Sequence, residues 1–279
     1  MGTSQSSKGA GSGVPMVPSW VDNPPPEAPT GDEPPAEGEE QLAQPPAAPP
    51  PAPIAPDRRW LGVNRSLGDY ARTGDTGSMR RGFGHYVRSG YGGSATATRR
   101  MGGTAATAGA LGGALAGLAR GEPPPPGSPL DPALLAGRSA DEIMDAVVEA
   151  VRPVDGTQDA EASRAAIRDA LSELLTRFPD ADLLNLTSEQ RELAIERFTA
   201  HDVFRRFDLD VGQTIREKAP TTATGLSRLK QARDYVKETV AAAFRRLREA
   251  GRTLTAGRIS EVVRAALRET FDVFEGYAE

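Results

Sequence analysis

Proline is the residue that most restricts what this chain can fold into, because fifteen of its 24 prolines fall within residues 1–57. Proline donates no backbone hydrogen bond and ends helices and interior strands. The few hydrophobic residues of the segment are scattered among Pro, Gly, Ser and acidic side chains. Such a composition does not bury enough apolar surface to offset an ordering entropy of about 1–2 kcal/mol per residue. We therefore expect residues 1–57 to be a disordered tail and the fold to lie beyond it.

Charge is distributed unevenly along the sequence, although the whole chain carries only −5. One Lys and eight acidic residues give residues 1–57 a charge of −7, whereas ten Arg and two Asp give residues 58–121 a charge of +8. These opposite charges are compatible with two arrangements. Either the acidic tail folds back on the basic segment, or each segment binds a partner of its own.

The chain contains no cysteine, which excludes disulfides, a thiolate nucleophile and cysteine-ligated metal sites. Residues 1–13 are polar and lack the apolar stretch of a secretory signal peptide. We therefore expect a cytoplasmic protein.

Residues 58–121 are rich in Gly, Ala and Arg, and their pattern predicts a helical segment. The predicted helices are 64–73, 77–90 and 94–119. In the third helix, Gly109, Gly113 and Gly117 recur at four-residue intervals, a spacing that lets another helix approach the backbone closely. Because glycine costs a helix about 1 kcal/mol relative to Ala, we expect this helix to need a packing partner.

A proline-rich stretch, residues 122–132, should form an extended linker. Beyond it, residues 133–279 carry the clearest helical periodicity, with capping-box spacings that start at Ser139 and Thr187. No segment alternates as a strand does. The expected fold class is therefore all-α, with a C-terminal helical bundle or array.

Several features of this C-terminal domain are specific predictions. The helix after Thr187 is expected to bend near Asp202. A long helix is expected after Pro220 and should end at Gly251. The last helix is expected from Thr255, and its apolar residues follow a 3.6-residue period.

Catalytic and metal-binding patterns are poorly represented. The only histidines, His85 and His201, lie in different segments, so neither a metal site nor a Ser/His/Asp triad is indicated, and His201 is expected to be structural. Residues 208–212 resemble the start of a calcium loop, but the glycine comes one position early and the glutamate ligand is missing. No phosphate-binding loop is present. We expect no enzyme activity, no cofactor and no metal.

The arginines of the second segment are candidate partner-binding residues. They are Arg80, Arg81, Arg88, Arg99 and Arg100. Phe83, Tyr86 and Tyr91 lie between them, and a mixture of cations and aromatic rings is typical of nucleic-acid-binding surfaces. The competing interpretation is an interface with an acidic protein or with the chain's own tail.

Residues 101–119 carry no charge and are flanked by arginines, so their length would allow a membrane span. The run is mostly Gly, Ala and Thr, however, with only three Leu, which makes its transfer into lipid marginal. We favour a helix that packs within the protein. A membrane-active effector remains an alternative.

An island of larger apolar residues, Val-Pro-Met-Val-Pro-Ser-Trp-Val, occupies residues 14–21 of the tail. One interpretation is a chance cluster. The other is a docking segment that becomes ordered on a partner, with Trp20 as its principal contact.

The first residues of the sequence offer a reactive amine. Removal of Met1 would expose Gly2, whose α-amine has a pKa near 8 and so a usable neutral fraction at pH 7. The same start also fits the Met-Gly-x-x-x-Ser pattern of N-myristoylation. An ordinary trimmed terminus is the third interpretation.

The sequence resembles the QatB family, the associated proteins of the bacterial Qat anti-phage defence system. The resemblance rests on residues 1–4, 17–22, 84–90, 98–104, 127–132, 151–157 and 271–277. It implies three partners: an ATPase, a QueC-like relative of the enzyme that makes the nitrile of 7-deazaguanine bases, and a TatD-like nuclease.

The resemblance also implies a role for Gly2. QueC-like defence enzymes activate a 7-deazaguanine carboxylate with ATP and join it to the N-terminal glycine of a protein. By this resemblance Gly2 is the acceptor, and the helical body is a scaffold for the other subunits. The alternatives are a nucleic-acid-binding adaptor that uses the arginines and a membrane-active effector that uses residues 101–119.

Overall fold

The computed structural model describes residues 11–17, 54–124, 126–255 and 257–278. Most of the predicted tail, residues 1–57, therefore lies outside the described residues. The described residues fold into helices, and their only strand-like pairing is an isolated antiparallel bridge between Pro15 and Ile54. The all-α fold class predicted from the sequence is confirmed.

The helical elements fall into two runs along the chain. The first contains α1 (Leu61–Thr73), α2 (Thr76–His85), the π-helical turn η1 (Tyr86–Gly90), α3 (Ser94–Arg100) and α4 (Gly102–Arg120). The second contains α5 (Pro132–Leu135), α6 (Ala140–Val151), α7 (Gln158–Arg177), α8 (Ser188–Phe207), the π-helical turn η2 (Asp208–Gly212), α9 (Gln213–Lys218), α10 (Thr222–Glu249) and α11 (Ile259–Glu275).

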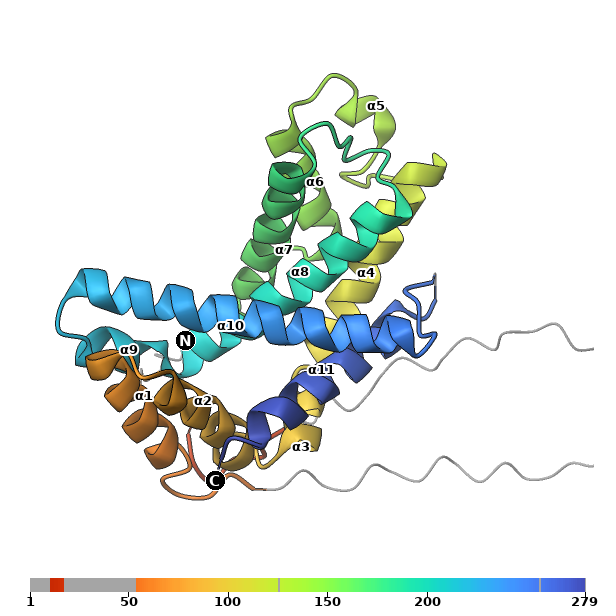
Figure 1. Ribbon diagram of the computed structural model, residues 1–279. Coiled ribbons are helices and arrows are strands. Elements are labelled where there is room, and N and C mark those ends of the chain that lie inside the picture. Colours follow the sequence, from red (N-terminus) through yellow and green to blue (C-terminus); the bar gives the residue numbers. More distant parts are fainter. Residues whose placement is uncertain (1–10, 18–53, 125, 256, 279) are drawn as a thin grey trace, which may run out of the picture.

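The long helix α10 crosses the middle of the molecule (Figure 1). At one of its ends it packs on α9 and α1, with α2 beside α1. At the other end α11 crosses it and returns the C-terminus to the neighbourhood of α2. Above α10, α6, α7 and α8 form a layer that α4 closes by packing on α6, α8 and α11.

One hydrophobic core joins the two runs of helices. It extends from Trp60 to Phe274 and takes buried residues from both. At its centre the ring of Phe83 stacks between those of Phe207 and Phe274, with centroid distances of 4.4 and 4.8 Å. Since these rings come from α2, α8 and α11, residues 58–121 and 133–279 are packed as one unit.

The predicted helix over residues 94–119 is interrupted, which corrects the sequence-based expectation. It divides into α3 and α4 at Met101, whose ψ of 16° departs from helical geometry. The Met101 side chain is fully buried. On either side of the break, α3 and α4 both pack against α11.

The glycine spacing of this segment was also misread. Of the three predicted close-contact glycines, only Gly109 lies against another element, beside Ser260 of α11, whereas Gly113 faces open space. Gly112, which the four-residue spacing leaves out, packs equally closely, against Ile195 and Ile259. The physical reason is that four residues advance a helix by more than one turn, so a stripe at four-residue intervals rotates away from the core.

Most predictions for the C-terminal helices are confirmed. The capping boxes at Ser139 and Thr187 are formed, and α10 begins and ends close to the expected residues. The predicted bend near Asp202 is wrong, because α8 is regular and the irregularity follows it as η2. The last helix begins four residues later than expected, because a turn from Thr255 to Arg258 precedes it.

No helix among the described residues has the length and hydropathy needed to cross a lipid bilayer. The uncharged stretch predicted as either a packing helix or a membrane span forms most of α4. Its buried residues include Ala105, Ala108, Leu111 and Leu115, which face α8 and α11.

Candidate partner-binding surface and N-terminal anchor

The five candidate arginines are distributed over three consecutive elements. Arg80 and Arg81 lie on α2, Arg88 on η1, and Arg99 and Arg100 at the end of α3. Gly2 and Trp20, the other candidate residues, lie outside the described residues.

α2 turns Arg80 and Arg81 away from the core because its opposite face is buried. The carboxylate of Asp75 caps the helix by accepting hydrogen bonds from two first-turn backbone N–H groups, and it also pairs with Arg81 at 3.7 Å. Arg80 lies over the rings of Tyr235 and Tyr277, 5.9 and 5.6 Å from their centroids. Both arginines are exposed, and Arg80 in addition contacts these two rings.

Arg81 and Arg88 occupy one surface around His85. The pKa of His85 is lowered, first because burial desolvates its ring and then because Arg88 and Arg81 oppose a further positive charge. Arg88 and Arg81 are both exposed. The structure therefore brings these two candidate residues together as a cationic surface.

Arg99 and Arg100 are only partly buried, and Arg100 belongs to a different environment. Burial raises the pKa of Asp210, and Arg100 is among the groups that oppose this rise. Arg100 also adds to the lowering of the Arg59 pKa, of which burial is the main cause. The five arginines therefore do not form a single patch.

The aromatic residues between the arginines are core residues. Phe83, Tyr86 and Tyr91 expose only 1, 2 and 7% of their surfaces. A ring that stacks on a nucleic-acid base must be accessible on one face. The aromatic part of the nucleic-acid prediction is therefore wrong, and what remains of it is the exposed arginines Arg80, Arg81 and Arg88.

Two of these rings hold a carboxylate between two π-helical turns. The hydroxyl groups of Tyr86 and Tyr91 donate to the same oxygen of Asp210 at 2.8 and 2.5 Å. The ring of Trp60 packs against both tyrosines, with centroid distances of 5.7 and 5.8 Å. Burial and the Asp210 charge raise the pKa of both tyrosines, so they remain hydrogen-bond donors at neutral pH. This cluster joins η1 to η2.

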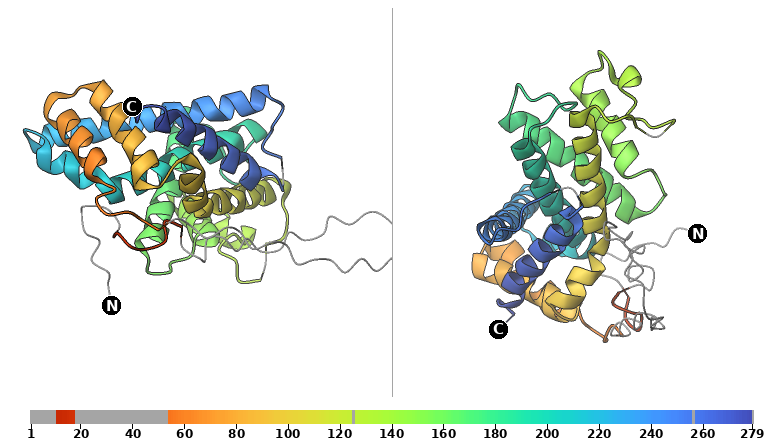
Figure 2. Two further views of the ribbon diagram at one scale, coloured as in Figure 1. Left: turned by 90° about the horizontal axis from the view of Figure 1, so that it is seen from below. Right: turned by 90° about the vertical axis from the view of Figure 1, so that its right-hand side faces the viewer.

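A short N-terminal segment, residues 11–17, is attached to the helical body, and we call it the N-terminal anchor. Its backbone pairs with Ala55: the Gly13 N–H donates to the Ala55 carbonyl, and the Ala55 N–H donates to the Val14 carbonyl, both at 2.9 Å. Met16 and Val17 are buried at its end. Figure 2 shows this segment in red beside the stretch that leads into α1.

Arg59 connects the N-terminal anchor to the helices. Its guanidinium donates to the Gly90 carbonyl at 3.1 Å and to the Gly11 carbonyl at 3.0 Å. The group also lies 5.0 Å from the ring centroid of Trp60. The preceding residue, Arg58, has a φ of 58°, a conformation uncommon outside glycine. Sequence reasoning missed Arg59, although an Arg-Trp pair directly after the proline-rich segment was a visible signal.

The apolar island at residues 14–21 is thus partly accounted for within the chain. Its first half, Val14 to Val17, docks on the protein itself, whereas the sequence left open a chance cluster and a segment that docks on a partner. The other half, which contains Trp20, lies outside the described residues.

A comparison with known protein families shows which family the chain belongs to. The family described as Qat anti-phage system associated protein QatB matches residues 92–274, about two thirds of the chain. The chain belongs to the QatB family. No curated protein and no solved structure matches it.

The QatB match begins just after η1 and extends almost to the end of α11. It includes Arg99 and Arg100, but not Arg80, Arg81 or Arg88. The N-terminal anchor and Arg59 also precede it. Membership of the QatB family therefore associates the chain with anti-phage defence, whereas the anchor is a feature described from the structure alone.

The QatB-family core contains a completely buried carboxylate, Asp202 of α8. It accepts hydrogen bonds from Thr104 of α4 at 2.5 Å and from Ser163 of α7 at 2.7 Å. Arg206 lies 3.4 Å from the same carboxylate and 2.9 Å from Asp159. Because Asp202 is fully buried and both of its carboxylate oxygens accept hydrogen bonds from neighbouring helices, we interpret the cluster as structural.

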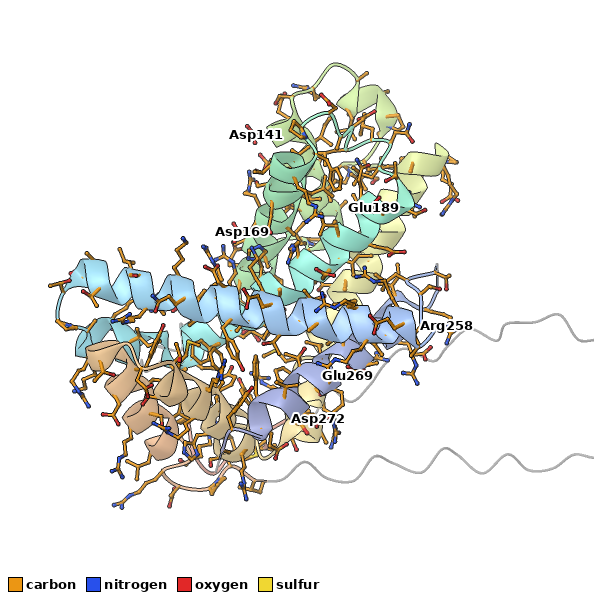
Figure 3. The ribbon with its side chains drawn as sticks, viewed as in Figure 1. Asp141, Asp169, Glu189, Arg258, Glu269 and Asp272 are labelled. Carbon is orange, nitrogen blue, oxygen red and sulfur yellow. The ribbon has the colours of Figure 1, made fainter. Side chains whose placement is uncertain are left out.

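A second charged network surrounds His201 where α7, α8 and α10 meet. The Glu173 carboxylate accepts from Lys237 at 2.8 Å and lies 3.1 Å from His201 Nε2. Burial is the main cause that lowers the pKa of His201, which is 6% exposed. Asp169, labelled in Figure 3, pairs with Arg205 at 2.5 Å on the same side. The predicted structural role of His201 agrees with this packing.

Neither network resembles a metal centre. Among the residues that the structure describes, no group of three or more His, Asp and Glu side chains is arranged to hold a metal ion. A cavity of about 500 Å³ lies between α4, the start of α8 and the loop before α11. Its two arginines are already engaged, Arg120 with Glu122 and Arg191 with the Leu186 carbonyl.

Proposed function

We propose that this QatB-family chain is a non-enzymatic component of the anti-phage system whose N-terminal glycine, Gly2, accepts a 7-deazaguanine group from a QueC-like enzyme. The helical body then serves as the scaffold that binds this enzyme, the ATPase and the TatD-like nuclease. Two observations support the proposal. The family match associates the chain with the defence system, and the N-terminal anchor attaches the start of the chain to the body.

The observation that carries most weight is the position of the anchor. Eight residues lie between Gly2 and Gly11, whose carbonyl is bound by Arg59, so nine Cα-to-Cα steps join the two glycines. A chain of that length spans at most about 32 Å. A partner that binds the helical body near the anchor would find the amine within that distance, and proximity of this kind raises the rate of a bimolecular reaction.

The proposed reaction is an amide-forming acyl transfer. The partner enzyme first converts the deazaguanine carboxylate and ATP into an acyl adenylate and pyrophosphate. The neutral amine of Gly2 then attacks the acyl carbon, AMP leaves with the electron pair of the broken C–O bond, and the nitrogen loses a proton. With a pKa near 8, about a tenth of the amine is neutral at pH 7. The chain supplies the nucleophile, and the partner supplies the activation.

The experiment that tests this proposal compares Gly2→Leu with Gly9→Leu, the same substitution at a glycine that is not the acceptor. Each protein is co-expressed with the QueC-like partner, and the mass of its N-terminal peptide is measured. We expect a Met-less chain with a deazaguanine-sized adduct for the wild type and for Gly9→Leu, and no adduct for Gly2→Leu. Anti-phage protection should follow the same order, because protection depends on the conjugate.

Two results would count against the proposal. One is an unmodified N-terminus in the wild type although the partner is active. The other is full protection by Gly2→Leu. The circular dichroism of all three proteins should be alike, because neither substitution changes a residue of the helices that the structure describes.

A further inference from the structure

The contact between α1 and α2 brings together arginines from two stretches of the chain. Gly62 of α1 faces His85, whose ring would lie 3.0 Å from a methyl group on that glycine. Further along the contact, a methyl group on Gly82 of α2 would overlap the side chain of Leu67. The two helices therefore pack antiparallel over this length, at one end of the molecule (Figure 1).

Four exposed arginines surround this contact, and we call them the basic face. They are Arg58, Arg65, Arg81 and Arg88. Burial is the first cause that lowers the pKa of His85, and Arg88 and Arg81 lower this pKa further because they lie close to the ring. These two arginines therefore share one side of the helix contact.

Two neighbouring contacts place the other half of the basic face. Arg58 directly precedes Arg59, whose guanidinium donates to the Gly90 carbonyl at the end of η1. Arg65 lies on α1, three residues after Gly62. Both arginines are thus held beside η1 and α2.

The protein leaves most of the basic face without a counter-charge. Arg81 pairs with Asp75 at 3.7 Å. Within the described residues, Arg58, Arg65 and Arg88 form no ion pair and no side-chain hydrogen bond. A guanidinium group without a partner is free to bind an anion, and its planar array of N–H donors matches phosphate and carboxylate groups.

We infer that the basic face binds the phosphate backbone of a nucleic-acid duplex. Residues 54–90 contain seven Arg, three Asp and no Lys or Glu, a net charge of +4 that attracts the densely spaced phosphates of a duplex. A single strand is disfavoured because the rings of Phe83, Tyr86 and Tyr91 are buried and cannot stack on its bases. The inference goes beyond the proposed function and does not depend on the modification of Gly2.

An acidic protein is the competing partner for such a surface. The centre of a protein–protein interface is apolar and rich in aromatic residues and Met. Among the large hydrophobic side chains exposed in the described residues, only Leu61 belongs to α1, α2 or η1. A surface of separate arginines with little apolar area around them fits a phosphate backbone better, because arginine side chains supply many of the contacts that proteins make to phosphates.

The test measures binding of the full chain to a fluorescein-labelled DNA duplex of 20 base pairs by fluorescence anisotropy, at several salt concentrations. The protein is produced without its partners, so its N-terminus is unmodified. We expect a slope of log K against log salt concentration of about −3, because each of three or four phosphate contacts contributes about −0.9. A single strand of the same length should bind more weakly.

Two triple variants locate the binding surface. The basic-face variant combines Arg58→Gln, Arg65→Gln and Arg88→Gln. The control variant combines Arg245→Gln, Arg252→Gln and Arg264→Gln, which lie at the end of α10 and on α11, the part of the molecule where Figure 3 labels Arg258. All six arginines are exposed and form no ion pair within the described residues, so both variants lose the same charge and should keep the wild-type circular dichroism.

We expect the basic-face variant to bind the duplex at least about tenfold more weakly at 0.1 M salt, with a slope reduced to about −1. The control variant should stay within about twofold of the wild type, because its arginines touch no phosphate. Equal losses in the two variants would show that net charge alone sets the affinity, and the inference would fail.

The two histidines give a second, independent readout. His85 lies within the basic face, whereas His201 is 6% exposed where α7, α8 and α10 meet. Nuclear magnetic resonance of the histidine rings should therefore show that the duplex shifts the signals of His85 and leaves those of His201 in place. Unchanged His85 signals at saturating duplex would place the contact elsewhere and overturn the inference.

A final comparison separates a duplex from an acidic protein. Poly-L-glutamate of about 40 residues carries about as many negative charges as the 20-base-pair duplex, and it serves as the competitor. We expect the duplex to bind more tightly, because its charges are more closely spaced along its axis. Tighter binding of poly-L-glutamate, or no duplex binding at 50 mM salt, would overturn the inference, and neither result bears on whether Gly2 is the acceptor.

Discussion

Buried polar side chains decide much of the packing at the scale of single residues. Asp202 has no exposed surface and links α4, α7 and α8 through Thr104, Ser163 and its neighbour Arg206. A carboxylate in such a place is stable only while its partners remain, because an unpaired buried charge has a large desolvation cost. Arg59 is the comparable residue at the N-terminal anchor, where one guanidinium binds two carbonyl groups.

Asp202→Ala should destabilise the protein strongly, since it leaves two hydroxyl groups and part of Arg206 without an acceptor. We expect the free energy of unfolding to fall by about 3 kcal/mol or more. Asp208→Ala is the control, because Asp208 pairs with Arg216 near the surface and its loss should cost about 1 kcal/mol or less. Urea unfolding followed by circular dichroism measures both. Equal losses would show that the Asp202 cluster contributes little.

At the scale of elements, α2 and the residues after α11 approach each other closely because residue 84 of α2 is glycine. A methyl group on Gly84 would overlap the backbone of Tyr277 and Ala278, which follow α11. A backbone cannot move aside as a flexible side chain does, so α2 and the C-terminus pack as they do only with glycine there. In α4, by contrast, Gly113 has no neighbour within 4 Å on its Cβ side.

Alanine at these two glycines should therefore change stability in opposite directions. Gly113→Ala should raise the free energy of unfolding by up to about 1 kcal/mol, because alanine favours the helix and meets nothing. Gly84→Ala should lower it by about 1–3 kcal/mol, because the C-terminal residues must shift. Thermal unfolding of both variants and of the wild type measures these two changes in stability. A stabilised Gly84→Ala would contradict the close approach.

For the whole molecule, the important fact is that the two predicted helical segments share one core. Phe83 stacks between Phe207 and Phe274, and the hydroxyl of Tyr70 donates to the Arg228 carbonyl at 2.8 Å. α4 packs between α8 and α11. Residues 58–121 are therefore part of the folded body.

A fragment of residues 133–279 should consequently fail to unfold cooperatively, because it lacks Phe83, Tyr70 and α4. The control fragment, residues 54–279, retains the whole core and should unfold in one transition close to that of the full chain. Both fragments are titrated with urea and followed by circular dichroism and by near-ultraviolet signals that do not depend on tryptophan. The sharpness of each transition measures how cooperatively the fragment unfolds. A sharp transition for residues 133–279 would show that the shorter fragment is an independent domain.

The sequence by itself determined the all-α class, the capping boxes at Ser139 and Thr187, and the buried face of the last helix. These features depend on residues a few positions apart, so local chemistry and a 3.6-residue period reveal them. The resemblance to the QatB family was also visible in the sequence.

Only the tertiary structure decided which side chains are accessible and which segments meet. Tyr86 joins Asp210 across 124 residues, and Arg59 joins Gly11 across 48. Short-range sequence patterns do not reveal which distant residues pair, because these pairings form only when the whole chain folds. For that reason the aromatic rings between the arginines were assigned to a binding surface, the break at Met101 was missed, and the N-terminal anchor was recognised only in the folded chain.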